Sequence, residues 1–171
     1  MEIVFYPDRV LRAKCEPVRE IDDRTFERAH QMIDCMHEAD GVGLAGPQVG
    51  WKKRIVALDT GEQGPDERIF VNPQITDREG EEEAEEGCLS LPGIWLPVTR
   101  AERVVVTAYT IRGKKLEMEA EGLLSRAWQH EVDHLNGILI IDRVPATTRM
   151  RIRGKLKKLE ERAAEKQKTA G

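Results

Sequence analysis

Residues 129–134 (Gln-His-Glu-Val-Asp-His) combine two histidines with a glutamate in a pattern suited to hydrolytic chemistry. His130 and His134 are four residues apart, so on a helix both imidazoles point the same way and can bind one divalent metal ion. Glu131 then lies beside that metal, where its carboxylate can move a proton to or from a bound water. The pattern therefore predicts a metal-dependent hydrolase.

A third metal ligand has to come from elsewhere, because a catalytic metal usually has three protein ligands and an open position for water. No histidine or acid follows at the spacing usual in metalloproteases, although Asp142 remains an alternative. Cys88 is the stronger candidate, since a thiolate binds zinc or ferrous iron well and Gly87 lets the backbone approach closely. Burial as a small apolar residue is the other interpretation of Cys88, and we expect it for Cys15 and Cys35.

The histidine pair needs a helix, and residues 121–136 have the pattern of one, ended by Gly137. One stripe of this helix carries two apolar residues and both histidines: Leu123, Ala127, His130 and His134. Such a stripe normally faces the core, which predicts that both histidines are buried.

The other elements follow from periodicity and from turn residues. A helix capped by Asp22 is expected at 21–39, a glycine-rich loop at 41–50, and a charged helix capped by Thr147 or Thr148 at 147–168. Extended segments are expected at 54–59, 69–72 (ended by Pro73), 79–86, 103–111, 114–119 and 138–141. The predicted fold class is α+β, with antiparallel sheets packed around the central metal-binding helix.

Length and composition fit a single soluble domain over residues 1–171. Apolar residues make up 40% of the chain and charged residues 34%, which excludes a disordered protein. No apolar run approaches the roughly 20 residues of a membrane span, and the first residues lack the pattern of a secretory signal. Three cysteines are too few for a disulfide framework, so we expect a cytoplasmic protein without membrane contact.

The charge is distributed unevenly. Residues 149–171 carry nine Lys/Arg against three Asp/Glu, whereas the rest of the chain is acidic. A solvated helical surface is the simpler interpretation of this basic segment, and docking to an anionic partner is the alternative.

Three segments resemble the signature motifs of the peptide deformylase family, and they occur in the family's order. They are 41–48 (Gly-Val-Gly-Leu-Ala-Gly-Pro-Gln), 86–90 (Glu-Gly-Cys-Leu-Ser) and 129–135 (Gln-His-Glu-Val-Asp-His-Leu). One departure is visible: the family commonly has two alanines after Leu44, whereas this chain has Ala45 and Gly46, followed by Pro47. We expect Gly46 to make this loop more flexible.

The resemblance implies a metal held by Cys88, His130 and His134, with Glu131 as the general base. It also implies that the side-chain amide of Gln48 and the backbone N–H of Leu89 stabilise the oxygen of the formyl group under attack. The substrate is then the formylated N-terminal methionine of a new polypeptide, and formate is released. The resemblance further implies that Val42, Leu123 and Ala127 line the methionine pocket, while Gly43 and Glu86 contact the peptide backbone.

The resemblance also bears on the metal and on partners. Family members use ferrous iron in the cell, and Zn²⁺ or Ni²⁺ fits the same ligands in purified protein. Bacterial members dock on ribosomal RNA through a C-terminal helix, which gives residues 149–171 a possible partner. Asp133 or Arg100 could orient a metal-bound imidazole, and the sequence does not decide between them.

Two other functions share part of this pattern. A metallopeptidase that cuts internal peptide bonds would use His130, Glu131 and His134 but leaves Cys88 and the glycine-rich segment unexplained. A ribosome-associated factor with a structural zinc would need four protein ligands, and the sequence offers only three clear ones.

Overall fold

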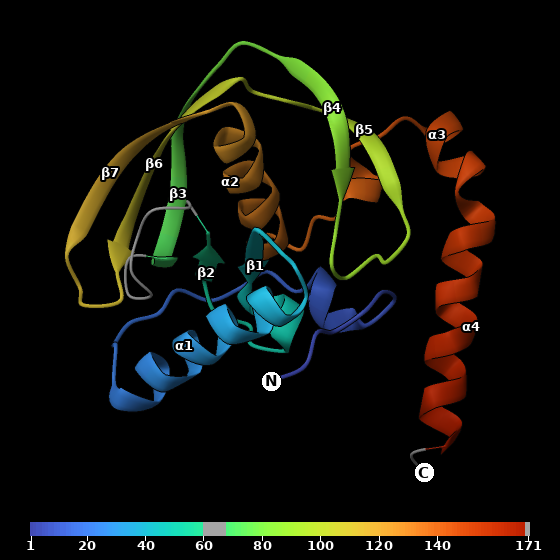
Figure 1. The fold of residues 1–171 in the computed structure, drawn as a ribbon, viewed down its shortest axis with the longest axis horizontal. Helices are drawn as coiled ribbons and strands as arrows, with labels where there is room; N and C mark the ends of the chain where they lie inside the picture. Colours follow the sequence, from blue (N-terminus) through green and yellow to red (C-terminus); the bar gives the residue numbers. More distant parts are fainter. Residues whose placement is uncertain (60–67, 170–171) are drawn as a thin grey trace.

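The computed structural model describes residues 1–59 and 68–169 and confirms the α+β class (Figure 1). Its described strands form one five-stranded and one two-stranded sheet, both antiparallel. The large sheet has the order β1 (Gly43–Ala45), β2 (Ile55–Leu58), β3 (Ile69–Glu79), β6 (Arg103–Thr110) and β7 (Lys115–Glu121). The small sheet pairs β4 (Glu82–Gly87) with β5 (Trp95–Arg100).

Helix α2 (Gly122–Leu135) lies between the two sheets, as predicted (Figure 1). Its apolar face packs on the large sheet, where the ring of Trp128 meets Phe70 edge-on with centroids 4.7 Å apart. The predicted inner stripe is partly wrong. Leu123 is 73% exposed and His130 is only partly buried, whereas His134 is buried as predicted. The helix therefore buries the side that carries Trp128 and Leu135, and the histidine stripe runs from the interior out to solvent.

Helix α1 (Asp23–Glu38) confirms the prediction for 21–39. Asp22 caps it by accepting a hydrogen bond from the backbone N–H of Thr25 at 2.8 Å. Its buried residues, Ala29, Met32, Ile33, Cys35 and Met36, share one core cluster with β1, β2 and β3. This cluster supports the short strand β1 from behind.

The segment 41–50 is not the loop that its glycines predict. It contains β1 and the 3-10 helix η2 (Gly46–Val49), and residues 43–49 are all buried. A Cβ on Gly46 would lie 2.5 Å from the carbonyl oxygen of Trp51 and 2.6 Å from that of Lys53. Gly46 therefore allows close backbone packing, and the expected flexibility at this position is wrong.

Strand β3 continues through Pro73, contrary to the prediction that it ends there. The register against β6 shifts between Val71 and Gln74, so the missing N–H of Pro73 falls in a bulge. Asn72 has a φ of 52° at this bulge. Its side chain accepts a hydrogen bond from the N–H of Val18 and donates one to the carbonyl of Val18, both at 2.8 Å.

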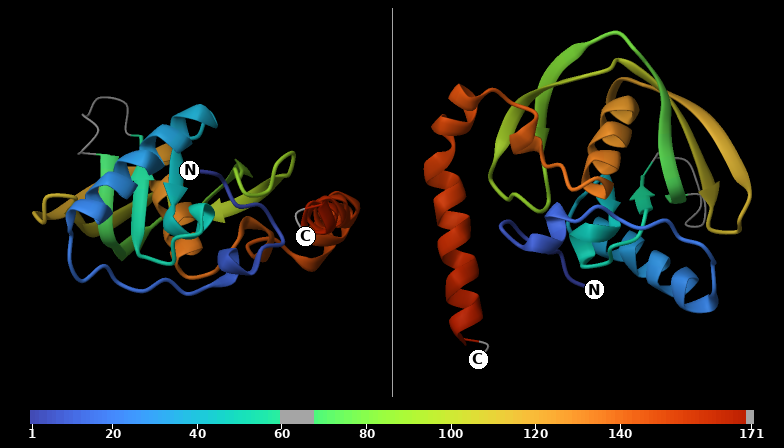
Figure 2. Two further views of the ribbon diagram at one scale, coloured as in Figure 1. Left: turned by 90° about the horizontal axis from the view of Figure 1, so that it is seen from below. Right: turned by 180° about the vertical axis from the view of Figure 1, so that it is seen from behind.

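The C-terminal segment forms two helices rather than one, α3 (Ala146–Arg151) and α4 (Arg153–Thr169), separated at Ile152. Pro145, not a threonine, is the N-cap residue of α3, and residues 138–141 lead into the 3-10 helix η4 (Ile140–Asp142) rather than a strand. Helix α4 runs along one side of the molecule (Figures 1 and 2). Residues 170–171 of the expected basic segment lie outside the described part.

Apolar residues just before α4 and within it pack on the rest of the molecule. Ile152 and Leu159 are each 8% exposed and pack with Leu91 and Ile94 of the segment before β5. Lys155 donates a hydrogen bond to the carbonyl oxygen of Gly93 at 3.1 Å. None of the described helices is both long and apolar enough to cross a membrane.

Replacing Asn72 tests the account of the bulge. Asn72→Ala removes two hydrogen bonds and replaces asparagine, which tolerates positive φ, with alanine, which disfavours it, so we expect the free energy of unfolding to fall by about 2–4 kcal/mol. Asn72→Gly removes the same bonds without the backbone strain and should be less destabilising by about 1 kcal/mol. Urea unfolding curves measure both, and equal losses in the two variants would contradict the role of φ.

Candidate metal centre and substrate cleft

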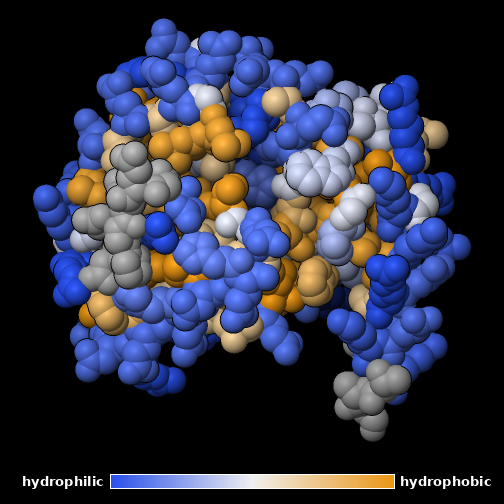
Figure 3. Space-filling view, viewed as in Figure 1, coloured by the Kyte–Doolittle hydropathy of each residue, from blue (hydrophilic) through white to orange (hydrophobic). Residues whose placement is uncertain are grey.

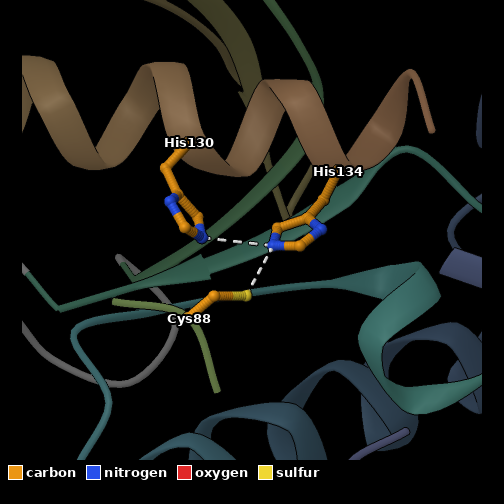
Figure 4. A group of neighbouring side chains, drawn as sticks. All are labelled: Cys88, His130 and His134. Atoms are coloured by element: carbon orange, nitrogen blue, oxygen red, sulfur yellow. Dashed lines mark hydrogen bonds between the residues drawn. The ribbon is translucent and has the colours of Figure 1, made fainter. Parts of the chain in front are cut away.

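Three side chains converge at the inner face of α2 (Figure 4). The Sγ of Cys88 lies 3.3 Å from the Nε2 of His134, and that nitrogen lies 3.2 Å from the Nε2 of His130. Among the described residues, these three atoms lie within 4.8 Å of one another and could hold a metal ion. Tetrahedral bonds of ordinary length would separate such ligand atoms by about 3.3–3.6 Å, so the donor set fits a divalent ion.

Two elements bring these ligands together. The histidines are one helical turn apart on α2, whereas Cys88 follows the last residue of β4. The N–H of Leu91 donates to the carbonyl of Cys88 at 2.9 Å, which closes a tight turn directly after the strand. The thiol is therefore held between a paired strand and a turn, and it points toward the helix (Figure 4).

Glu86 orients His130 through a buried charge cluster. Its Oε2 lies 3.1 Å from the Nδ1 of His130, which leaves Nε2 of the ring to face the other ligands. Arg100 donates to both carboxylate oxygens, at 2.9 and 3.0 Å, and Arg126 donates to Oε1 at 2.9 Å. Burial alone would raise the pKa of Glu86, but the bonds from His130 and Arg100 outweigh it and lower the pKa to about 2.

Within the part of the chain that the structure describes, neither Arg100 nor Asp133 forms a side-chain hydrogen bond with a histidine. Arg100 acts on His130 only through Glu86, and Asp133 binds the Nη1 of Arg100 at 2.6 Å. The sequence contains one signal for this role of Glu86. It lies two residues before Cys88, and in an extended chain two such side chains point to the same face. The resemblance predicts a contact between Glu86 and the peptide backbone, whereas its side chain is occupied by this cluster.

Glu131 is 4% exposed and lines the same cavity as Cys88 and His130. Within the described part of the chain, its Oε2 has no hydrogen-bond partner. A Cβ on Gly43 would lie 2.4 Å from Oε1 of Glu131. Only glycine at position 43 therefore leaves room for this carboxylate where it lies. Burial raises the pKa of Glu131 to about 7, which is the range of a general base at neutral pH.

Gln48 is 1% exposed, so it is not a solvent-facing loop residue. The N–H of Ala45 donates to its Oε1 at 2.9 Å, which fixes the orientation of the amide. Its Nε2 lies 3.2 Å from the Oγ of Ser90 and 3.7 Å from the Sγ of Cys88. The amide donors of Gln48 are thereby directed at the candidate metal centre.

A cavity of about 460 Å³ opens from this centre to the surface. In Figure 3 the surface is hollowed near the middle of the view, and both hydrophobic and hydrophilic side chains border the hollow. All of the predicted site residues except His134 line the cavity: Val42, Gly43, Gln48, Glu86, Cys88, Leu89, Leu123, Ala127, His130 and Glu131. His134 lies deeper, and it is 1% exposed.

The cavity also has lining residues that the sequence did not predict, and two of them are Trp95 and Arg126. Trp95 is 64% exposed at the edge of the cavity, and its ring approaches Gly87 so closely that a Cβ there would lie 3.0 Å from it. Arg126 is buried and joins the carbonyl oxygens of Glu82 and Val98 to α2, at 2.9 and 2.7 Å. Neither belongs to a motif, and their positions depend on the pairing of β4 with β5.

Known proteins resemble this chain along nearly its whole length. A profile of the family described as polypeptide deformylase matches residues 1–150. The peptide deformylase of Thermodesulfovibrio yellowstonii is 48% identical over 159 residues, which cover 92% of this chain and 96% of that protein. The peptide deformylase of Chromobacterium violaceum is 44% identical over 160 residues, covering 94% and 96%.

Comparison with solved structures leads to the same family. The crystal structure of a peptide deformylase from Legionella pneumophila matches this one with a TM-score of 0.85 at 41% identity, covering 95% of this chain and 96% of that chain. The chain therefore belongs to the peptide deformylase family, whose members are metal-dependent hydrolases that remove the formyl group from the N-terminal methionine of nascent polypeptides.

Proposed function

We propose that Cys88, His130 and His134 hold the divalent metal ion with which this chain hydrolyses the formyl group. The observation that carries the proposal is the convergence of these donor atoms with the unpartnered carboxylate oxygen of Glu131, at the inner end of the cavity. A bound divalent cation would supply an acidified water and polarise the formyl oxygen.

Glu131 acts as the general base and then as the general acid. Its carboxylate takes a proton from the attacking water and passes it to the amine nitrogen that departs. Its burial raises its pKa to about 7, and a bound cation would draw that value down. The space left by Gly43 lets the carboxylate reach toward the cavity without moving β1.

Gln48 and Leu89 stabilise the negative oxygen that forms during attack. The amide of Gln48 is locked by Ala45, so its donors need no reorganisation when charge develops. The backbone N–H of Leu89 belongs to the residue after Cys88, which places it near the same oxygen by covalent geometry. Together they form the oxyanion-binding pair expected from the resemblance.

The cavity walls divide between the methionine side chain and the peptide backbone. Val42, Leu123 and Ala127 supply apolar surface, and the first two are 54% and 73% exposed, at the mouth. Gly43 and the main chain of Glu86 lie on strands that border the cavity, where a peptide can run beside them.

We propose Fe²⁺ as the working metal, with Zn²⁺ or Ni²⁺ as substitutes in purified protein. The Cys/His/His donor set accepts all three ions. The half-buried thiol lines an open cavity, so oxygen can reach it, and a thiolate bound to ferrous iron is prone to oxidation.

We further propose that the chain is one cytoplasmic domain over 1–171. We also propose that its basic C-terminal segment, residues 149–171, contacts ribosomal RNA. The support is the charge of residues 149–171 and the exposure of most of their Lys and Arg side chains, which include Arg149, Arg151, Lys158 and Arg162. Such a helix binds phosphate without reading sequence.

Formate release from a formyl-methionyl peptide, measured with metal content on the same sample, tests the main proposal. We expect Glu131→Gln to lower kcat by about 10²–10⁴-fold because it removes the proton-transfer group. Metal content should stay unchanged, since Glu131 is not a ligand. The control is Glu85→Gln, at an exposed acid on the same cavity, which should keep near-normal activity. An active Glu131→Gln variant, or faster cleavage of an unblocked peptide, would refute the assignment.

Handling in air tests the metal. We expect aerobic purification of iron-loaded protein to lower activity far more than it lowers the thermal midpoint, because oxidation of the thiol destroys the centre before it affects the core. A zinc-loaded sample treated in parallel should lose little. Equal activity from aerobic and anaerobic iron-loaded samples would count against iron.

Cosedimentation with ribosomes across a salt series tests the basic helix. Truncation at 149 is unsuitable because it removes the buried Ile152 and Leu159. We expect the triple variant Arg151→Glu/Lys158→Glu/Arg162→Glu to lose salt-sensitive binding. The matched control, Lys52→Glu/Arg78→Glu/Lys114→Glu, makes the same charge change at exposed sites elsewhere and should still bind. Equal binding by both triple variants would remove the proposal.

A further inference from the structure

Arg100 serves two buried carboxylates at once. Its Nε and Nη2 donate to Glu86, and its Nη1 donates to Oδ2 of Asp133 at 2.6 Å. Glu86 is 5% exposed and Asp133 is 6% exposed, so both charges depend mainly on protein partners for their stabilisation. The two carboxylates therefore share one guanidinium. A stronger attraction between Arg100 and Asp133 would weaken the hydrogen bonds from Arg100 to Glu86.

Arg143 is the second partner of Asp133. It follows η4, and its Nε donates to Oδ2 of Asp133 at 2.8 Å while its Nη2 contacts Oδ1. Its side chain is 41% exposed, whereas that of Arg100 is 4% exposed. Arg143 thus neutralises Asp133 from the solvent side and forms a two-pronged contact with it.

The chain turns back sharply to bring Arg143 to this position. Gly137, after α2, has a φ of 75°, and a Cβ there would lie 2.5 Å from the carbonyl oxygen of Arg12. Arg12 also forms an ion pair with Asp142, the neighbour of Arg143. The backbone that carries Arg143 is therefore fixed on both sides, which favours a defined orientation of its guanidinium.

We propose that Arg143 is a positioning residue for the metal centre, acting through Asp133 and Arg100 on the bond between Glu86 and His130. With Asp133 neutralised by Arg143, Arg100 keeps two bonds to Glu86, and Glu86 keeps the ring of His130 oriented. Without Arg143, Arg100 shifts toward Asp133 and His130 loses its fixed orientation. The inference rests on the proposed ligand set, and it concerns a residue outside the cavity.

The rate at which zinc passes from the loaded protein to a chromogenic chelator tests this role. Loss of a direct partner of a metal ligand typically lowers metal affinity 10–100-fold. Arg143 acts on such a partner, Glu86, through Asp133 and Arg100, so we expect an effect at the low end, with Arg143→Met releasing zinc about 10-fold faster. Arg143→Lys restores the charge without the fork and should give an intermediate rate. The control is Arg103→Met. Arg103 also pairs with two carboxylates, Glu79 and Glu119, but neither of them contacts a proposed metal ligand. Its release rate should stay within about twofold of the unchanged protein.

The thermal midpoint of the metal-free protein separates positioning from general stability. If Arg143→Met lowers that midpoint but leaves zinc release unchanged, or if Arg103→Met accelerates release equally, the inference is overturned. A double-variant cycle adds a second test: in an Asp133→Asn background, Arg143→Met should cause no further acceleration. A full additional acceleration there would also overturn it. If Asp133→Asn does not fold, the single variants decide.

Failure of the proposed ligand set has a different signature. If the unchanged protein binds less than one zinc per chain, or if His130→Ala still binds zinc as tightly, the ligand assignment fails. If zinc binds and depends on His130 but Arg143→Met releases it at the normal rate, only the role of Arg143 fails.

Discussion

The buried carboxylate of Glu86 is the charge around which the centre is organised. A carboxylate with 5% exposure persists only when it is paired, and removal of one partner from such a cluster typically costs about 3–5 kcal/mol. Here the partners of Glu86 are Arg100 of β5 and Arg126 of α2. The ion pairs that neutralise Glu86 therefore also connect the small sheet to α2. The same carboxylate holds Nδ1 of His130, which leaves Nε2 as the nitrogen available for a metal.

Steric constraints complement this electrostatic one. Two glycines in the first motif are needed for space rather than for mobility: Gly43 admits the carboxylate of Glu131, and Gly46 admits the carbonyl groups of Trp51 and Lys53. Both lie in buried segments backed by α1. The wall opposite α2 is therefore closely packed beside the candidate metal centre, which suits a site that must hold donors in place before charge develops.

Local patterns in the sequence identified the parts of the site that depend on neighbouring residues. The spacing of His130 and His134 and the cysteine motif predicted the donor group, and the capping of α1 and the extended segments of β6 and β7 were also predicted correctly. The charge cluster was not predictable, because Glu86, Arg100 and Asp133 meet only when β4 and β5 fold over α2. Pro73 misled the strand prediction since a bulge accommodates it, and Leu123 misled the burial prediction because the histidine stripe borders an opening.

The attachment of α4 has a consequence for how the molecule can be held. The helix is anchored by Ile152 and Leu159, and Lys155 links it to Gly93, a residue that also lines the cavity. The short stretch of chain before β5 thus contacts both the helix and the cavity, so the two are packed together and not merely tethered. A large particle that gripped this helix would also set the direction in which the mouth points, and with it the angle from which an emerging chain end could enter.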